Sequence, residues 1–251
     1  MGKKTEAESR GSQLVRFLEL IKEFFCKASA EEGELVNSYQ INQLINELNR
    51  AEDGEKLTVN CENISFKVRA SNMDPSPKLK GKTIEVTLSL KYDWMKNGSV
   101  REVKSAEEKK DDNISIYDCN IQIKGYEEVK NVRRKFAWHL DCEENTQGKY
   151  IHPHFHFHAG GKKLSGLNTG ELLLISSPRI AYPPMDLPLA INFIIHNFVH
   201  QEDMGAQYDI LNQKYYKWML GQSVKNVLRP YFNDLSDNLE TTQNHYFPVM
   251  L

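Results

Sequence analysis

Hydrophobic residues near the N-terminus recur at the spacing of an α-helix. Over residues 13–28 they occupy positions i, i+3, i+4 and i+7, which places them on one helical face. A second stripe of this kind follows Asn37 and Ser38, either of which can cap the start of a helix. The polar segment at 51–56 closes that stripe. We therefore expect two amphipathic helices whose apolar faces belong to a core.

The pattern changes at Leu57 from helical spacing to alternation. Alternation predicts half-buried β-strands, because successive side chains of a strand point to opposite faces. The expected strands cover residues 59–70, 83–94, 114–126, 135–141, 153–159 and 172–176. The strand at 135–141 is expected to pair antiparallel with the one at 153–159.

Helical spacing returns in the last third of the chain. Asp186 can cap a helix that carries Pro188 in its first turn, where proline is tolerated. A further helical block covers about 205–229 and stops before Pro230.

The order of helices, then strands, then helices predicts an α+β fold. We expect an antiparallel sheet of about five to seven strands, packed by N-terminal and C-terminal helices. An N-terminal helical segment should cover 1–56. An α+β domain with a histidine-rich strand and the C-terminal helices should cover 57–251, and the two should form one compact unit.

Composition excludes several classes of protein. With 251 residues, of which 40% are hydrophobic and 10% aromatic, the chain can bury a core, so intrinsic disorder is not expected. The net charge of −2 argues against a general nucleic-acid coat protein. The longest apolar run, 187–195, is too short to span a membrane. The polar N-terminal segment is no secretory signal, so we expect a cytoplasmic protein with no membrane partner.

Histidines are concentrated in one part of the chain, since seven of the eight lie between His139 and His200. Residues 151–161 read IHPHFHFHAGG, in which the histidines occupy every second position. On a strand, His154, His156 and His158 would share one face, about 7 Å apart from one to the next, while the phenylalanines pack on the other. Such imidazoles can bind a metal ion or act as acid and base.

Two more histidine groups could join this strand. His139 and Asp141 share a face of the preceding strand, and the strand register decides whether that face is the histidine face. His196 and His200 lie four residues apart on an expected helix, a spacing found in metal sites. The catalytic candidates are His139, His154, His156 and His158, and the candidate ligands of a divalent metal such as Zn or Mn are His154, His156, His158, His196 and His200.

Basic residues flank the histidine strands. Residues 121–140 carry five basic and two acidic side chains. Lys162 follows the histidine strand, and Arg179 precedes the helix that begins near Asp186. Lysine, arginine and a helix N-terminus all bind phosphate. Lys162 and Arg179 are therefore candidate phosphate-binding residues, and a nucleic acid or a nucleotide is the candidate ligand.

Three segments carry a resemblance to known sequences: WHLD at 138–141, HPHFHFHAGG at 152–161 and PLAINFIIHNF at 188–198. Over residues 130–200 the chain resembles uncharacterised prokaryotic histidine-rich domain families found beside toxin–antitoxin and phage-defence modules. The resemblance implies a toxin or defence role directed at nucleic acid, and a protein partner in such a complex. It implies no particular catalytic residue.

These patterns favour a histidine-centred phosphodiesterase or nuclease. One imidazole would act as base and another as acid, or a bound Zn or Mn ion would activate water. The alternative is a non-catalytic interaction subunit of a defence or toxin–antitoxin complex, in which the histidines are structural. A cupin-like metalloprotein is a third interpretation, although no glutamate follows the histidine pair at a short spacing.

Overall fold

The computed structural model describes nine stretches of the chain: residues 9–26, 35–51, 54–69, 83–95, 114–127, 132–142, 155–160, 180–199 and 205–232. The helices are α1 (Arg10–Phe25), α2 (Ser38–Arg50), α3 (Leu187–Phe198), the 3₁₀ helix η4 (Gly205–Asn212), α5 (Lys214–Ser223) and the short π-helix η5 (Val224–Leu228). The strands are β1 (Lys56–Arg69), β2 (Thr83–Met95), β3 (Ile114–Glu127), β4 (Val132–Cys142), β5 (Phe155–Ala159) and β6 (Ile180–Ala181).

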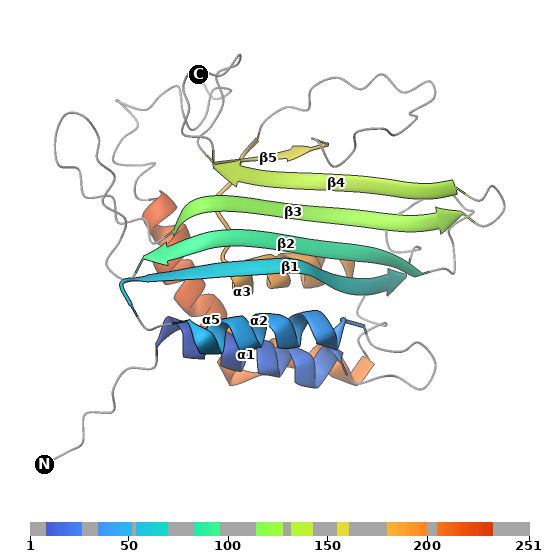
Figure 1. Ribbon diagram of the computed structural model, residues 1–251. Helices are drawn as coiled ribbons and strands as arrows, with labels where there is room; N and C mark the ends of the chain where they lie inside the picture. Colours follow the sequence, from blue (N-terminus) through green and yellow to red (C-terminus); the bar gives the residue numbers. More distant parts are fainter. Residues whose placement is uncertain are drawn as a thin grey trace, which may run out of the picture.

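The six strands form one antiparallel sheet in chain order, β1-β2-β3-β4-β5-β6 (Figure 1). The predicted α+β fold is confirmed, and so is the pairing of the strand around 135–141 with the one around 153–159. The expected strand at 172–176 lies outside the described residues. The two-residue strand β6 is too short to leave an alternating pattern in the sequence.

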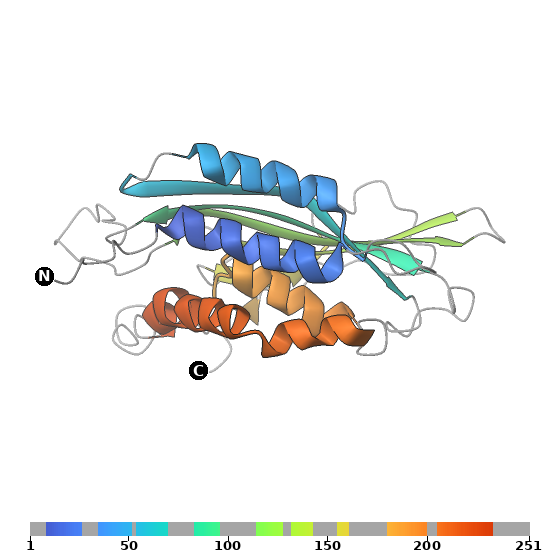
Figure 2. The same cartoon turned by 90° about the horizontal axis from the view of Figure 1, so that it is seen from below.

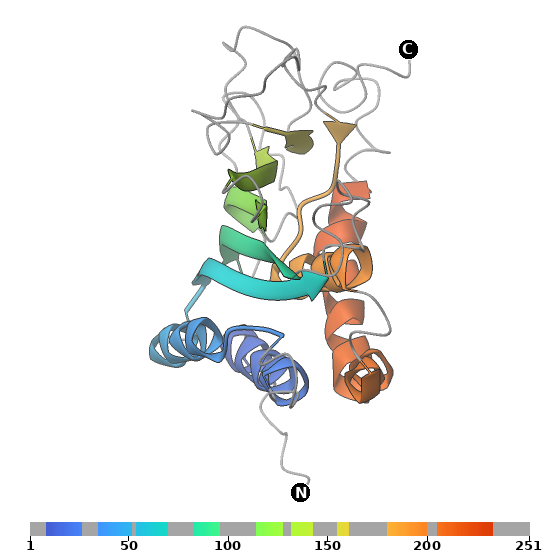
Figure 3. The same ribbon diagram turned by 90° about the vertical axis from the view of Figure 1, so that its right-hand side faces the viewer.

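The helices pack around the apolar face of the sheet: α1 and α2 lie beneath the β1 end, and α3 and α5 lie beside the strands (Figures 2 and 3). Apolar side chains of the strands point to that face, among them Phe66, Leu88 and Ile121, each no more than 1% exposed. They pack with the buried stripes of the helices in a single hydrophobic core. This core includes Phe17 of α1 and Ile191 of α3, so residues from both predicted segments, 1–56 and 57–251, contribute to it.

A bulge keeps β1 in phase with this core. Cys61 is opposite Leu90 and Ile64 is opposite Leu88, so β1 has one residue more than β2 in this stretch. Asn63 absorbs the extra residue in a left-handed conformation, with φ of 55°. Both Cys61 and Ile64 therefore stay buried on the helix side of the sheet.

Asp186 joins three helices at one point. As predicted, it caps α3, because its carboxylate accepts a hydrogen bond from the backbone N–H of Leu189 at 3.2 Å. The same carboxylate forms an ion pair of 2.6 Å with Arg10 of α1 and accepts a hydrogen bond of 2.7 Å from Ser223 of α5. The buried carboxylate of Asp186 thus links α1, α3 and α5.

The helical block expected over 205–229 is present but divided. Gln213 is extended, with φ of −63° and ψ of 130°, so the 3₁₀ helix η4 ends there and α5 begins afresh. No helix among the described residues is long and apolar enough to cross a membrane.

Candidate metal centre

The histidine strand β5 separates aromatic from imidazole side chains. Phe155 and Phe157 point to the helix side: Phe155 contacts Tyr117 at a ring separation of 5.7 Å, and Phe157 contacts Phe193 of α3 at 6.1 Å. His156 and His158 alternate with them and therefore lie on the opposite face. The predicted division of this strand is confirmed for these four residues.

The register of β4 and β5 brings the two histidine strands into contact on that face. His139 is opposite His158, and Asp141 is opposite His156. The ring of His158 lies 5.2 Å from that of His139 and 5.4 Å from that of His156. This register shows that the face of β4 that carries His139 is the same face that carries the histidines of β5.

Asp141 lies between two imidazoles. Its Oδ2 is 2.8 Å from Nε2 of His139, and its Oδ1 is 2.8 Å from Nε2 of His156. Burial by itself raises the pKa of this carboxyl, but the contacts with His139 and His156 outweigh burial and hold the pKa well below its usual range. Asp141 is therefore a carboxylate at neutral pH, which both metal binding and the orientation of an imidazole require.

Strand β3 adds two side chains to the same face. Asn120 Oδ1 lies 2.7 Å from Nδ1 of His139, and Asn120 Nδ2 donates a hydrogen bond of 2.5 Å to Oδ1 of Asp118. They are adjacent because Asn120 is opposite His139 and Asp118 is opposite Asp141 in the β3–β4 ladder. The network thus runs across three strands, from Asp118 to His156.

His158 completes a group with the donor types of a metal site. Donor atoms of His139, Asp141 and His158 all lie within 4.8 Å of one another. Two imidazoles and one carboxylate, with the remaining positions open, are a ligand set used by catalytic metal centres. Burial lowers the pKa of His158, which favours the neutral imidazole that a metal ion needs.

Exposure separates the roles within the cluster. The side chains of His139 and Asp141 are 24% and 28% exposed, so solvent reaches them. His156 is 1% exposed, which suits a residue that orients Asp141 better than one that contacts a substrate. The predicted residues His139, His156 and His158 are thus brought together.

The other predicted site residues are not brought into this cluster. His196 is exposed on α3, whose Phe193 contacts Phe157 on the helix side of the sheet, so His196 lies on the other side from the cluster. The remaining predicted residues, His154, His200, Lys162 and Arg179, lie outside the described residues.

Three residues of the cluster, Asp118, Asn120 and Asp141, are not among the site residues that the sequence predicts. Asp141 was recognised only as sharing a strand face with His139. Asp118 and Asn120 alternate on β3, and this pattern marks one polar strand face. That face becomes part of the site only through the β3–β4 register, which the sequence does not specify.

Lysines share the polar face of the sheet with the cluster. Lys91, Asp118 and Asp141 lie in one row across β2, β3 and β4, since Lys91 is opposite Asp118 and Asp118 is opposite Asp141. Lys124 and Lys135 are opposite each other at the other end of β3 and β4. Among the described residues, none of these three lysines has an ion pair, although Lys91 is opposite Asp118 and Lys124 is opposite Glu85.

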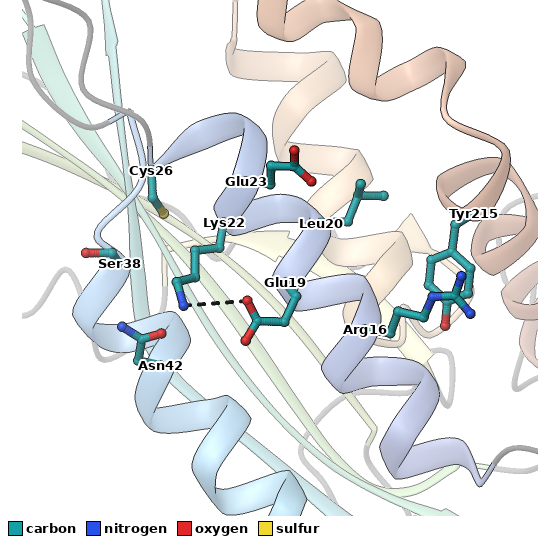
Figure 4. A pocket seen from close by; sticks show the side chains of 9 residues that line it. All are labelled: Arg16, Glu19, Leu20, Lys22, Glu23, Cys26, Ser38, Asn42 and Tyr215. Carbon is teal, nitrogen blue, oxygen red and sulfur yellow. Dashed lines mark hydrogen bonds and ion pairs between the residues drawn. The ribbon is translucent and has the colours of Figure 1, made fainter.

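A separate pocket lies between α1, α2 and α5 (Figure 4). Its charged side chains balance, because Arg16 and Lys22 are accompanied by Glu19 and Glu23. Lys22 forms an ion pair of 3.5 Å with Glu19. This pocket contains no histidine and lies on the helix side of the sheet, so it is not connected with the histidine cluster.

Comparison with known proteins finds no matching family model, no similar curated protein and no similar solved structure.

Proposed function

We propose that the protein is a phosphodiesterase or nuclease whose centre is a divalent metal ion, such as Zn or Mn, held by His139, Asp141 and His158. The observation that carries this proposal is the convergence of their donor atoms within 4.8 Å. When bound, such an ion lowers the pKa of a coordinated water to near neutrality and makes it a nucleophile.

The surrounding residues support a metal centre over a chance grouping. Metal-bound histidines usually donate their second ring N–H to an oxygen acceptor, and metal-bound carboxylates are usually hydrogen-bonded as well. Asn120 Oδ1 supplies the acceptor for His139, and Nε2 of His156 makes an ion-pair contact of 2.8 Å with Oδ1 of Asp141. Both ligands on β4 are therefore held in place from outside the set.

The choice of a phosphodiester rests on charge. Lys91, Lys124 and Lys135 lie on the same face as the cluster, beside Glu85, Asp118 and Asp141, and each lysine can contact a phosphate group locally. The resemblance over residues 130–200 to prokaryotic defence-associated families favours nucleic acid, in a toxin or phage-defence context.

A second candidate is a non-catalytic interaction subunit with structural histidines. The burial of His156 favours it, since a buried imidazole in ion-pair contact with a carboxylate can stabilise a sheet without any chemistry.

A hydrolysis assay separates the two candidates. Wild-type protein is incubated with Mn²⁺ or Zn²⁺ and either a chromogenic phosphodiester or labelled single-stranded DNA and RNA. We expect His158→Ala to lower kcat at least 100-fold and His196→Ala, the matched control from the other side of the sheet, to leave it unchanged. Equal activity in both variants contradicts the proposed centre, and an inactive wild type with either metal favours the interaction subunit.

A further inference from the structure

The polar groups on β3 determine which ring nitrogen of His139 carries its proton. Asp118 as a carboxylate can only accept hydrogen bonds, so the atom of Asn120 at 2.5 Å from it has to be the donor Nδ2. The reversed amide would place two oxygens at that separation. Asn120 Oδ1 is therefore the atom that faces His139.

The orientation of Asn120 fixes His139 in turn. Asn120 is 6% exposed, so its Oδ1 needs a donor within the protein, and Nδ1 of His139 lies 2.7 Å away. A carbonyl oxygen cannot donate, so Nδ1 carries the proton. Nε2 then faces Oδ2 of Asp141 at 2.8 Å, either with a second proton, which accounts for the lowered pKa of Asp141, or with its lone pair.

Two electron-pair donors at this separation repel each other unless a cation lies between them. Two ligands bound to one ion at about 2.1 Å each are about 3.4 Å apart in a tetrahedral site and about 3.0 Å apart in an octahedral one, so the observed 2.8 Å would open by a few tenths of an ångström when an ion enters. A second proton on His139 is the competing cation, and it would occupy the same lone pair.

We propose that Asn120, oriented by Asp118, is a positioning residue that holds His139 with Nδ1 protonated, so that Nε2 is the metal ligand. This inference deepens the proposed function and rests on its metal centre. Neither Asp118 nor Asn120 contacts the ion. Their effect is to select the ring nitrogen and fix the plane of the imidazole.

The chain offers a matched pair of variants that test this role. Asn120→Leu keeps the size of the side chain and removes the acceptor. The double variant Asp118→Asn with Asn120→Asp exchanges the two groups: the new amide on position 118 can donate to the new carboxylate on position 120, which still accepts from His139. Composition and net charge are unchanged in the exchange.

Calorimetric titration with Zn²⁺ at neutral pH is the first measurement. We expect Asn120→Leu to weaken zinc binding about 10- to 100-fold, the usual effect of losing an outer partner of a metal ligand. The exchanged double variant should bind within about 3-fold of wild type. Zinc binding by Asn120→Leu equal to that of wild type overturns the proposal, and so does an exchanged variant that is as weak as Asn120→Leu.

Nitrogen-15 NMR of the imidazoles keeps the proposal testable if Asn120→Leu fails to fold. In wild-type protein, the Nδ1 resonance of His139 should be that of a protonated nitrogen, with or without zinc, and Nε2 should shift on zinc addition. An unprotonated Nδ1 overturns the proposal. A wild type that binds no zinc but has Nδ1 protonated leaves the role of Asn120 intact and contradicts the metal centre, so the two failures are distinguishable.

Discussion

Nε2 of His139 and Oδ2 of Asp141 lie 2.8 Å apart on one strand, two residues from each other. Side chains at this spacing share a face of a strand but ordinarily stand about 7 Å apart. Here the imidazole and the carboxylate lean together, while Asn120 holds the far nitrogen of the ring and His156 the far oxygen of the carboxylate. Asp141 is therefore the residue on which the cluster depends most.

Replacing Asp141 by Asn should lower stability at neutral pH and have a smaller effect in acid. The lowered pKa of Asp141 means that its contribution is fully present above the ordinary carboxyl pKa of about 3.9 and is lost as pH falls through the folded value. We expect Asp141→Asn to lower the free energy of unfolding by roughly 1.5–3 kcal/mol at pH 7. This difference should shrink below about pH 4. Urea unfolding at pH 7 and at pH 3 measures it, and an equal difference at both values would contradict this assignment.

Removing the imidazole of His156 should destabilise the sheet. The side chain is 1% exposed and lies 2.8 Å from Oδ1 of Asp141, so His156→Ala leaves a cavity and removes the ion-pair contact of a buried carboxylate oxygen. We expect a loss of about 2–4 kcal/mol in urea unfolding. The exposed His196 is the control, and His196→Ala should change stability by less than about 0.5 kcal/mol. Similar effects from the two substitutions would rule out a buried bridging role for His156.

The pH dependence of stability should carry the signature of His158. Burial lowers its pKa in the folded protein, so the unfolded chain binds more protons between the folded value and the ordinary value of about 6.5. The contribution of His158 is therefore present above pH 6.5 and falls as pH decreases through that window. The melting temperature of metal-free wild-type protein should fall more between pH 7.5 and pH 5 than that of His158→Gln. An equal fall in the two proteins would show that His158 titrates normally.

Lys91 should contribute to binding an anionic substrate. It is exposed, has no ion pair among the described residues, and lies in the same row across the strands as Asp118 and Asp141. We expect Lys91→Ala to raise KM for an oligonucleotide several-fold with little change in kcat, and the effect should diminish in high salt because exposed charges are screened. Lys217 on α5, on the helix side, supplies the matched control. An effect of equal size from Lys217→Ala would contradict the assignment of the polar face of the sheet as the substrate-binding surface.

Several elements were predictable because each follows from local spacing. The apolar stripes of α1 and α2, the cap at Asp186 and the alternation of Phe155 and Phe157 with histidine all repeat over a few residues. Each pattern states which face of an element is buried. The α+β fold followed from the order of these patterns along the chain.

The composition of the site was not predictable to the same degree, because it depends on register. One residue of slip between β4 and β5 would place His139 on the face opposite His158. The inclusion of Asn120 needs a second register, between β3 and β4. His196 satisfied a helical spacing typical of metal pairs, but the sheet lies between its helix and the cluster, and helical spacing alone carries no information on that separation.

Zinc titration of the purified protein tests the central claim most directly. Calorimetry at pH 7.5 should give one Zn²⁺ per chain for wild type and for His196→Ala, and should give no binding, or binding weakened at least 100-fold, for His158→Ala and Asp141→Ala. Circular dichroism of each variant establishes that it is folded. Wild-type protein that binds no zinc and no manganese, or a His158→Ala variant that binds zinc as tightly as wild type, would contradict a metal centre at His139, Asp141 and His158.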